Sequence, residues 1–307
     1  TDNSAEGDLF EEYSATAYRV HPYGSPVIGW MGDIENLTIQ DAREFHQLYY
    51  VPSNITVAIA GDIRLDELKT IAENYFGKIP TRPEAPDLVP QEPPQNYVRT
   101  IRVQRDDGMP EMIIGWHMPR YPHPDNVPLD IAAKILGDGR TSRLYKSLVE
   151  TGKAIDVSVN AETLQRYDGQ FTVRVTLKSD QPDQEVVDIV MNEIAMLQEN
   201  PPTEYEINRI KKQELVGFVR QLEANMWLAM QLAYFQEMIG DWRAVGSYLR
   251  DLENCTQEQV VKAVGTYLRT NNYTVAVLEE PPEEPEEQTA MEADSEQKAE
   301  VAAGEDK

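Results

Sequence analysis

Histidines are the first candidates for metal chemistry in this chain, because a hydrolytic zinc site needs three protein ligands and an open position for water. The sequence has four of them, His21, His46, His117 and His123. No pair has the His-x-x-x-His spacing that places two ligands on one face of a helix. His117 and His123 flank a predicted strand end and a proline-rich loop. The spacing therefore predicts that this chain holds no metal site of its own.

Nucleophilic and phosphate-binding motifs are equally scarce. The chain has no Gly-x-Ser-x-Gly sequence and no phosphate-binding loop. Its one cysteine, Cys255, rules out an internal disulfide and lies at a predicted helix start, where a thiolate is favoured. An internal repeat aligns Cys255 with Leu37, which indicates a buried apolar position instead of a catalytic thiol. Gly137-Asp138-Gly139 lies between predicted helices and not after a strand, so it does not indicate a nucleotide site.

That repeat joins a segment near the start of the chain to one near its end, at an offset of 218 residues. Residues 33–60 and 251–278 share nine identities in 28 aligned positions, where chance gives roughly one or two. Each copy reads as a threonine N-cap (Thr38 or Thr256), an amphipathic helix, a turn at an asparagine and a β-branched strand. The repeat predicts two homologous domains in tandem.

The position of the repeat divides the chain. The second domain is expected to span 97–279, so the first would begin about 120 residues before Thr1. Residues 1–80 are therefore expected to be the C-terminal part of a first domain that is truncated at its N-terminus. The stretch 79–96 contains six prolines, which predicts an extended linker over 81–96. Residues 280–307 are acidic and carry no aromatic side chain, so they are predicted to form a disordered tail.

The elements of the second domain predict an α+β fold with helices packed on one face of a mostly antiparallel sheet. Strands are expected near 98–104, 111–117, 154–162, 169–177 and 273–278, and helices near 127–136, 141–150, 184–199, 203–238, 241–252 and 256–269. In the first-domain segment, the pattern predicts a helix end at 8–18, a helix after Thr38, a buried strand at 55–60 and a helix at 65–76. Core positions are predicted for Trp30, Trp116, Met226, Trp227, Met230, Tyr234 and Met238. The truncation predicts exposed apolar surface on 1–80.

Composition excludes some partners. The net charge is −25, and residues 279–307 hold twelve acidic residues and two lysines, which leaves −15 for the rest. Nucleic-acid binding requires a basic stripe, and none is present. An acidic body either attracts basic peptides or serves solubility. No apolar run approaches the ~20 residues of a membrane span.

One ordered set of motifs resembles a known family. Leu136-Gly137-Asp138-Gly139 followed by Ser142-Arg143-Leu144-Tyr145 resembles the second-domain signature of the insulinase/pitrilysin family of zinc metallopeptidases, which includes mitochondrial-processing-peptidase-like members. His21-Pro22-Tyr23-Gly24, Pro26-Val27-Ile28-Gly29 and the helix–Asn54–strand unit leading to Gly61-Asp62 are similar to the first-domain sequence of that family. The resemblance covers roughly residues 8–278.

The resemblance implies two α+β domains around a closed chamber, with peptide substrates added as a strand to a sheet edge. It also implies a His-x-x-Glu-His motif in the first domain, which would lie before Thr1. The intact protein would then bind zinc, and this chain would contribute neither zinc ligands nor catalytic residues.

Arg143 is the residue that the resemblance assigns to substrate binding. It matches an arginine that holds the substrate backbone in some members, where its guanidinium donates paired hydrogen bonds. The tyrosine expected with it is replaced by Ile155, within Ala154-Ile155-Asp156-Val157-Ser158. The alternative is a structural arginine paired with an acid such as Glu150.

Three functions remain open at the sequence level. In the first, the chain is part of a zinc-dependent metalloendopeptidase and supplies its substrate-binding second domain. In the second, it belongs to a catalytically silent subunit that acts as partner or scaffold of a zinc-bearing peptidase. In the third, residues 97–278 are an independent binding module. The expected partners are a peptide or protein substrate and a family member in a homo- or heterodimer. The resemblance favours a periplasmic or secreted location.

Overall fold

A five-stranded sheet forms the centre of the protein. The computed structural model describes residues 4–87, 91–178 and 183–281. The strand order is β1-β5-β2-β4-β3, and only the β1–β5 pair is parallel. The strands are β1 (Arg99–Gln104), β2 (Glu111–Met118), β3 (Ala154–Ala161), β4 (Gly169–Leu177) and β5 (Tyr273–Glu279). These bounds agree with the predicted strands of the second domain to within one residue, and the predicted α+β class is confirmed.

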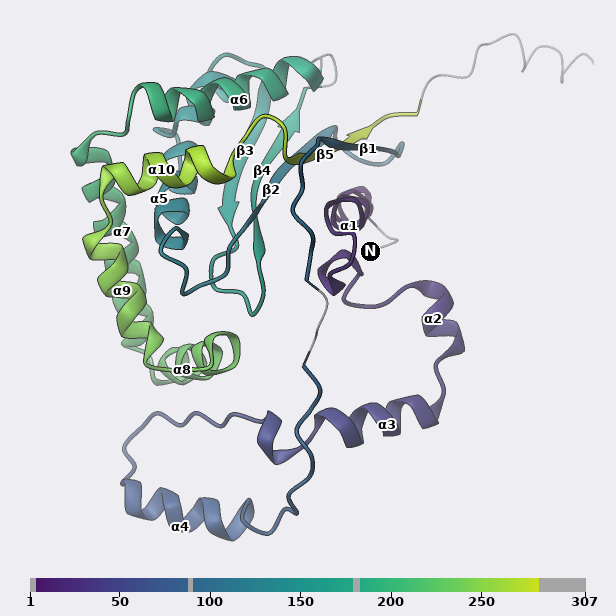
Figure 1. Ribbon diagram of the computed structural model, residues 1–307, viewed down its shortest axis with the longest axis vertical. Coiled ribbons are helices and arrows are strands. Elements are labelled where there is room, and N and C mark those ends of the chain that lie inside the picture. Colours follow the sequence, from purple (N-terminus) through teal and green to yellow (C-terminus); the bar gives the residue numbers. More distant parts are fainter. Residues whose placement is uncertain (1–3, 88–90, 179–182, 282–307) are drawn as a thin grey trace, which may run out of the picture.

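Helices cover one face of this sheet and bury the main core (Figure 1). They are α5 (Asn126–Gly137), α6 (Asp183–Glu199), α7 (Glu204–Leu222), α9 (Ala244–Asn254) and α10 (Gln257–Tyr267). Along β4, Phe171, Val173 and Val175 point into this core, because side chains alternate between the two faces of a strand. Trp116 is fully buried there, as predicted, and so is Cys255, at 4% exposure.

A separate helix, α1 (Ala5–Ala17), packs on the opposite face of the sheet. Leu9 and Tyr13 of α1 form a second core with Ile113 of β2 and Ala276 of β5. Figure 1 shows α1 on the side of the sheet away from α5, α6 and α10. The N-terminal helix therefore covers part of one face of the sheet, and helices from the middle and C-terminal parts of the chain cover the other.

The two copies of the repeat have the same local geometry. Thr38 begins α3 (Ile39–Tyr49) and Thr256 begins α10, each in a capping box with φ −107° and ψ 161–162°. The residue after each helix has φ −90° and ψ 65–66°. Asn54 and Asn272 then donate a side-chain hydrogen bond to the last helical carbonyl, at 2.9 and 3.2 Å. The predicted helix and turn are confirmed in both copies.

The strand that should follow differs between the copies. β5 pairs with β1 and β2, whereas residues 55–60 form no strand. The predicted buried strand at 55–60 is therefore wrong for this structure: Ile55, Val57 and Ile59 are 50–55% exposed. The physical reason is that no strand in the described part of the chain lies beside this segment to accept its backbone hydrogen bonds.

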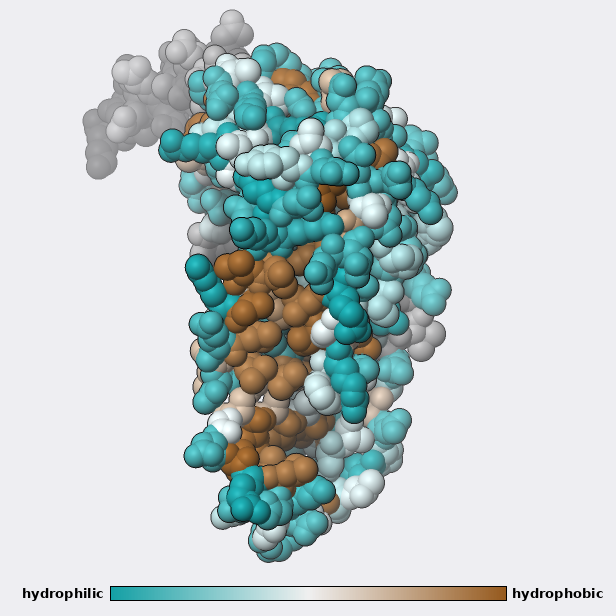
Figure 2. Space-filling model, turned by 90° about the vertical axis from the view of Figure 1, so that its left-hand side faces the viewer, coloured by the Kyte–Doolittle hydropathy of each residue, from teal (hydrophilic) through white to brown (hydrophobic). Residues whose placement is uncertain are grey.

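The neighbouring segment extends away from the sheet. Figure 1 shows α2 (Met31–Asn36), α3 and α4 (Leu65–Tyr75) in an arc below it. Phe45 and Ile71 are 57% and 47% exposed, which confirms the prediction of exposed apolar surface in this part. Trp30, predicted to be buried, is 41% exposed because α2 has no sheet to pack on. Figure 2 shows apolar side chains in a band at the height of α8 and α4.

Two predicted helices differ from the structure. The single helix at 203–238 is wrong, because the chain turns at Ala224 (φ −92°, ψ 124°) between α7 and α8 (Asn225–Ile239). α8 packs on α7 and α9 and not on the sheet, so only Phe235 is buried in it. Met226, Trp227, Met230 and Tyr234, predicted to be core residues, are 39–71% exposed. The helix predicted at 141–150 is present but shorter, over 143–149, and its last five residues, Tyr145–Val149, are π-helical.

The proline-rich stretch is anchored by its polar side chains. The Glu92 carboxylate accepts hydrogen bonds from the backbone N–H groups of Arg19, Val20 and His21 at 2.8–3.1 Å. Gln95 donates to the Tyr273 carbonyl at 2.8 Å. The predicted boundaries at 80, 96 and 279 stay predictions, and nearly all of the acidic tail lies outside the described residues.

Asp130 gives a prediction for the pH dependence of stability. Thr163 donates a hydrogen bond to Asp130, and so does Tyr248, at 3.0 Å. Burial raises the pKa of Asp130 to about 7, with nearby Glu214 adding to the rise. The folded state thus retains a proton that the unfolded state releases near pH 4, so stability is lost as the pH rises from about 4 to about 7.

The quantity to compare is the unfolding free energy of the wild type minus that of Asp130→Asn at the same pH. We expect this difference to fall by on the order of a few kcal/mol between about pH 4 and about pH 7, and to stay constant above pH 7. Urea denaturation at half-unit pH intervals measures this difference, and all other titrating groups cancel in it. Parallel curves for the two proteins would contradict the assignment.

Exposure also predicts where proteases cut. Arg43, Lys69 and Lys78 lie in exposed positions of the arc, whereas Lys134 and Arg174 lie in α5 and β4. Cleavage requires local unfolding, which costs least where few contacts hold the chain. Limited trypsin digestion followed by mass spectrometry should therefore show the first three sites cut before the last two. Simultaneous cutting of both groups would mean that the arc is as well protected as the sheet.

Candidate functional site

A groove of about 1010 Å³ lies between α1 and the face of the sheet that α1 only partly covers. Its floor comes from β2, β3 and β4, and its walls from α1 and the loop at 18–28. That loop includes the short helical turn Pro22–Gly24. The groove combines apolar walls with a few polar side chains, which makes it the candidate binding site.

Alternation along the β3–β4 hairpin gives the groove a polar floor. Ser158, Asn160 and Glu162 face it from β3 and the residue after it, while Gln170, Thr172 and Arg174 face it from β4. Ser158 is paired with Arg174, and Asn160 with Thr172. The residues between them, such as Val157 and Val173, point into the main core because the side-chain period of a strand is two. One hairpin thus supports a dry core on one face and a polar surface on the other.

The α1 wall is held by a close approach to a glycine. Tyr13 donates a hydrogen bond to the side-chain oxygen of Gln170 on the groove floor. Its hydroxyl lies directly over Gly115 of β2, where a Cβ would come within 1.7 Å of the tyrosine oxygen. Any side chain at this position would push α1 away from the sheet.

Charge in the groove is uneven. At one end, Arg174 forms an ion pair with Glu111, with Nη2 and Oε2 3.1 Å apart. At the other end, Glu162 accepts a hydrogen bond from the Gln170 backbone N–H at 3.1 Å and forms no ion pair with any described residue. Burial raises the pKa of the Glu162 carboxyl, and the Gln170 N–H only partly offsets this. A negative charge is therefore compensated at one end of the groove and not at the other.

Tyrosines surround the uncompensated end. Tyr13, Tyr18 and Tyr23 line the groove, and the rings of Tyr18 and Tyr23 meet edge to face with centroids 5.9 Å apart. Burial is the main cause of the raised pKa of all three hydroxyls, and the charge of Glu162 raises each pKa further. Tyr18 is only 8% exposed, and its hydroxyl makes no hydrogen bond of normal length with a described residue, although the nearby Gln170 side chain partly offsets the rise in its pKa.

The loop that carries Tyr18 and Tyr23 brings two of the histidines together. The rings of His21 and His117 lie 5.8 and 5.0 Å from the ring of Tyr18. Burial lowers the pKa of both histidines, so both favour the neutral form. His117 Nε2 is 3.0 Å from the Ala17 carbonyl. The sequence did not predict this contact, because the two residues are far apart along the chain.

No metal cluster is present among the residues that the structure describes: nowhere do three His, Cys, Asp or Glu side chains gather closely enough to hold an ion. The local hydrogen bonds are consistent with this: His21 Nδ1 accepts from the Tyr23 backbone N–H, His117 Nε2 lies beside the Ala17 carbonyl, and the Glu92 carboxylate near both rings is bonded to backbone N–H groups. The described side chains do not fit a zinc site.

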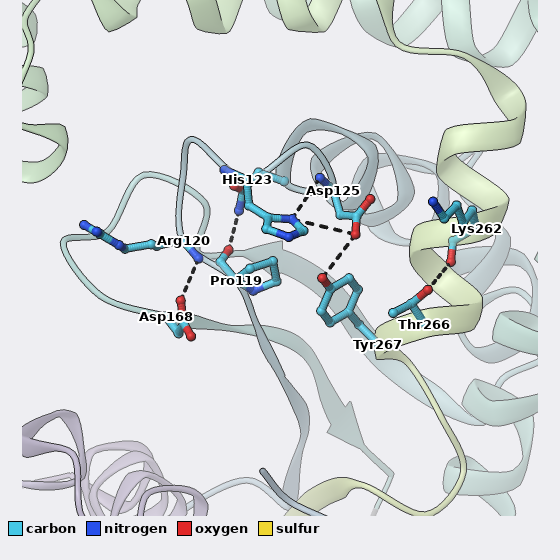
Figure 3. Close-up of polar contacts among 9 residues, drawn as sticks. Pro119, Arg120, His123, Asp125, Asp168, Lys262, Thr266 and Tyr267 are labelled. Carbon is cyan, nitrogen blue, oxygen red and sulfur yellow. Dashed lines mark hydrogen bonds and ion pairs between the residues drawn. The ribbon is translucent and has the colours of Figure 1, made fainter. Parts of the chain in front are cut away.

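His123 belongs to a different polar cluster at the end of β2 (Figure 3). Its Nδ1 lies 3.7 Å from Asp125 Oδ2, and the same carboxylate oxygen accepts a hydrogen bond from the Tyr267 hydroxyl at 3.1 Å. Arg120 donates its backbone N–H to Asp168 at 3.0 Å nearby. Figure 3 shows these side chains joining the loop before α5 to the end of α10. The cluster therefore fastens the loop between β2 and α5 to the end of α10 and to the loop before β4.

Arg143, the predicted substrate-binding residue, does not line the groove. It lies at the turn before Tyr145–Val149, and its Nη2 donates to the Asn200 carbonyl at 3.2 Å. Burial raises the pKa of Glu206, but the hydrogen bonds from Thr203 and the nearby charge of Arg143 outweigh burial. The net effect is a lowered pKa of Glu206. Ile155 is 49% exposed on β3. The substrate role of Arg143 stays a prediction.

The groove residues themselves were not predicted from the sequence. The available signal was the alternation of Asp156, Ser158, Asn160 and Glu162 with apolar neighbours, which marks a strand with one polar face. That signal predicts the hairpin but does not show that α1 covers part of its polar face.

Comparison with known proteins identifies related chains. Residues 36–214 match the family described as "Peptidase M16 inactive domain". The zinc protease PqqE of Helicobacter pylori is 27% identical over 286 residues, which cover 91% of this chain and 63% of that protein. The chain thus spans less than two thirds of the length of this curated relative.

Two solved structures share the fold. The crystal structure of a protease from Helicobacter pylori has a TM-score of 0.84 and 26% identity, covering 91% of this chain and 68% of that one. A peptidase M16 inactive domain from Pseudomonas fluorescens has a TM-score of 0.79 and 19% identity, covering 92% of this chain and 67% of that one.

None of the helices in the described residues is long and apolar enough to cross a membrane.

The contact between Tyr13 and Gly115 gives a prediction for the groove. Gly115→Ala should displace α1 and destabilise the protein by about 1–3 kcal/mol, because the added methyl overlaps the tyrosine hydroxyl. Gly32→Ala is the matched control, since a Cβ there meets no atom within 4 Å. Urea denaturation measures both variants. Equal stability of the two would show that α1 is not held at this point.

Proposed function

The chain belongs to the peptidase M16 (insulinase) family, whose inactive domain it carries, and we propose that it serves as the substrate-binding part of a zinc metallopeptidase. Peptide hydrolysis by this family of zinc proteases requires a zinc-bound water. The described residues of this chain do not fit a zinc site. In the proposed arrangement the zinc ion therefore belongs to another domain, on the same polypeptide or on a second subunit of the family.

The observation that carries this proposal is the groove with its polar hairpin floor. Three alternate positions on each strand face it, and together they cover roughly 13 Å, about the length of four extended residues. β3 is one of the two edge strands of the sheet. Extended peptides bind to such edges through main-chain hydrogen bonds, and pockets beside the edge receive alternate side chains. The groove lies over the face of the sheet next to β3, so a peptide that pairs with the β3 edge could place alternate side chains in it.

Apolar surface in the same groove supports a peptide ligand. Phe10, Val27, Ile28 and Ile113 line it together with the polar floor. Val27 and Ile28 are fully or largely exposed. Ligand sites typically combine apolar walls with a few polar groups that fix orientation. A peptide with alternating polar and apolar side chains matches this surface.

A blocking variant tests the proposal. Thr172→Trp fills the middle of the groove, whereas Thr176→Trp is the same change on the same strand and face, outside the groove. We expect binding of a fluorescein-labelled pool of random decapeptides, measured by fluorescence anisotropy, to weaken at least tenfold (~1.4 kcal/mol) in Thr172→Trp and to be unchanged in Thr176→Trp.

The outcome separates the proposal from its rival. Equal binding by both variants would place the peptide elsewhere on the protein. Absence of binding to the wild-type chain would contradict a substrate-binding role and favour a silent subunit that acts as partner or scaffold.

A further inference from the structure

We propose that the end of the groove around Glu162 is a subsite for a cationic side chain, lysine or arginine, of the bound peptide. This inference rests on the proposed function and specifies the class of substrate that the groove selects. Its basis is a half-buried carboxylate without a cationic partner, set among tyrosine rings, beside a buried hydroxyl that also lacks a partner.

The carboxylate of Glu162 is the first part of the subsite. Its one hydrogen bond, from the Gln170 backbone N–H at 3.1 Å, engages Oε2. No described Lys, Arg or His forms an ion pair with it. A carboxylate in partly apolar surroundings loses hydration, and a cation that pairs with it restores favourable interactions for the charge. Burial raises the pKa of Glu162, because the ionised carboxylate has lost hydration and has no cation beside it.

The tyrosines are the second part. Tyr13, Tyr18 and Tyr23 line the groove near Glu162, whose charge acts on all three hydroxyls, and Phe10 lines the α1 wall. An aromatic face attracts a cation through its quadrupole, and the attraction grows when water is excluded. The methylene stem of lysine or arginine also packs well against aromatic rings. Such rings suit a long cationic side chain better than a short polar one.

The hydroxyl of Tyr18 is the third and independent part. Tyr18 lines the groove and is more than nine-tenths buried, and its hydroxyl makes no hydrogen bond of normal length with the described chain. An unpaired buried hydroxyl costs stability, so such groups generally have a partner. A guanidinium or ammonium donor at this end would supply that partner while it pairs with Glu162.

Other charges do not oppose the assignment. Glu11 of α1 also lines the groove and forms no ion pair with described residues, so it adds negative potential. Arg174, the one cationic side chain that lines it, is neutralised by Glu111. Arg174 lies four residues along β4 from Gln170, roughly 13 Å away. The groove therefore selects for a basic residue at the Glu162 end only.

The experiment compares two peptides that differ in charge and hardly in shape. One is a fluorescein-labelled nonapeptide of alternating serine and valine with arginine at its centre, and the other has citrulline in place of the arginine. We expect the full chain to bind the arginine peptide roughly ten- to hundredfold more tightly in anisotropy titrations. Glu162→Gln should abolish the difference, because glutamine keeps the acceptor for the Gln170 N–H and removes the charge.

Glu12→Gln is the matched control, since it removes the same charge from an exposed position of α1 outside the groove. It should keep the full preference for arginine. A melting temperature for each variant shows that the fold is retained. If both peptides bind equally to the wild type, or if Glu162→Gln and Glu12→Gln behave alike, the cation subsite is wrong and the peptide groove stands. If neither peptide binds, the proposed function fails together with the subsite.

Discussion

The groove depends on the absence of a side chain at Gly115. Because β2 offers bare backbone there, the hydroxyl of Tyr13 can lie against the sheet and reach Gln170 on the neighbouring strand. This contact fixes the distance of α1 from the sheet, and α1 in turn positions the loop at 18–28 through the direct chain connection. The open part of the sheet face is therefore bounded on one side by a helix that packs on the sheet through its apolar residues and, at Gly115, comes into direct contact with the backbone of β2.

Local sequence and tertiary partners determine different parts of this fold. The two copies of the repeat adopt the same capping box, helix and asparagine turn, to within a few degrees. These features were predictable because their hydrogen bonds close within a few residues. The strand that follows was predictable only in the second copy, where β1 and β2 flank it. A strand needs partners, and residues 55–60 have none in the described chain, whatever their β-branched content.

The same distinction explains what could be predicted of the site. The β3–β4 hairpin follows from period-two alternation, so its polar residues were visible in the sequence. That these residues face α1 depends on contacts between Tyr13, Gly115 and Gln170, which are separated by up to 157 positions. The break between α7 and α8 was invisible for another reason, since Glu223-Ala224 contains neither glycine nor proline. Without that break, α8 could not bring Tyr234 to the carbonyl of Leu164 beside the groove.

The electrostatics of the groove are more specific than the overall charge. A net charge of −25 makes the electrostatic potential negative around the whole molecule and discriminates poorly between ligands. Within the groove, Glu111 neutralises Arg174, whereas Glu162 faces tyrosine rings and a single backbone N–H. An ionised carboxylate in such a place destabilises the empty protein, and a basic ligand relieves that cost on binding. A neutral ligand does not relieve that cost, so the unpaired carboxylate increases the difference in binding free energy between a basic ligand and a neutral one.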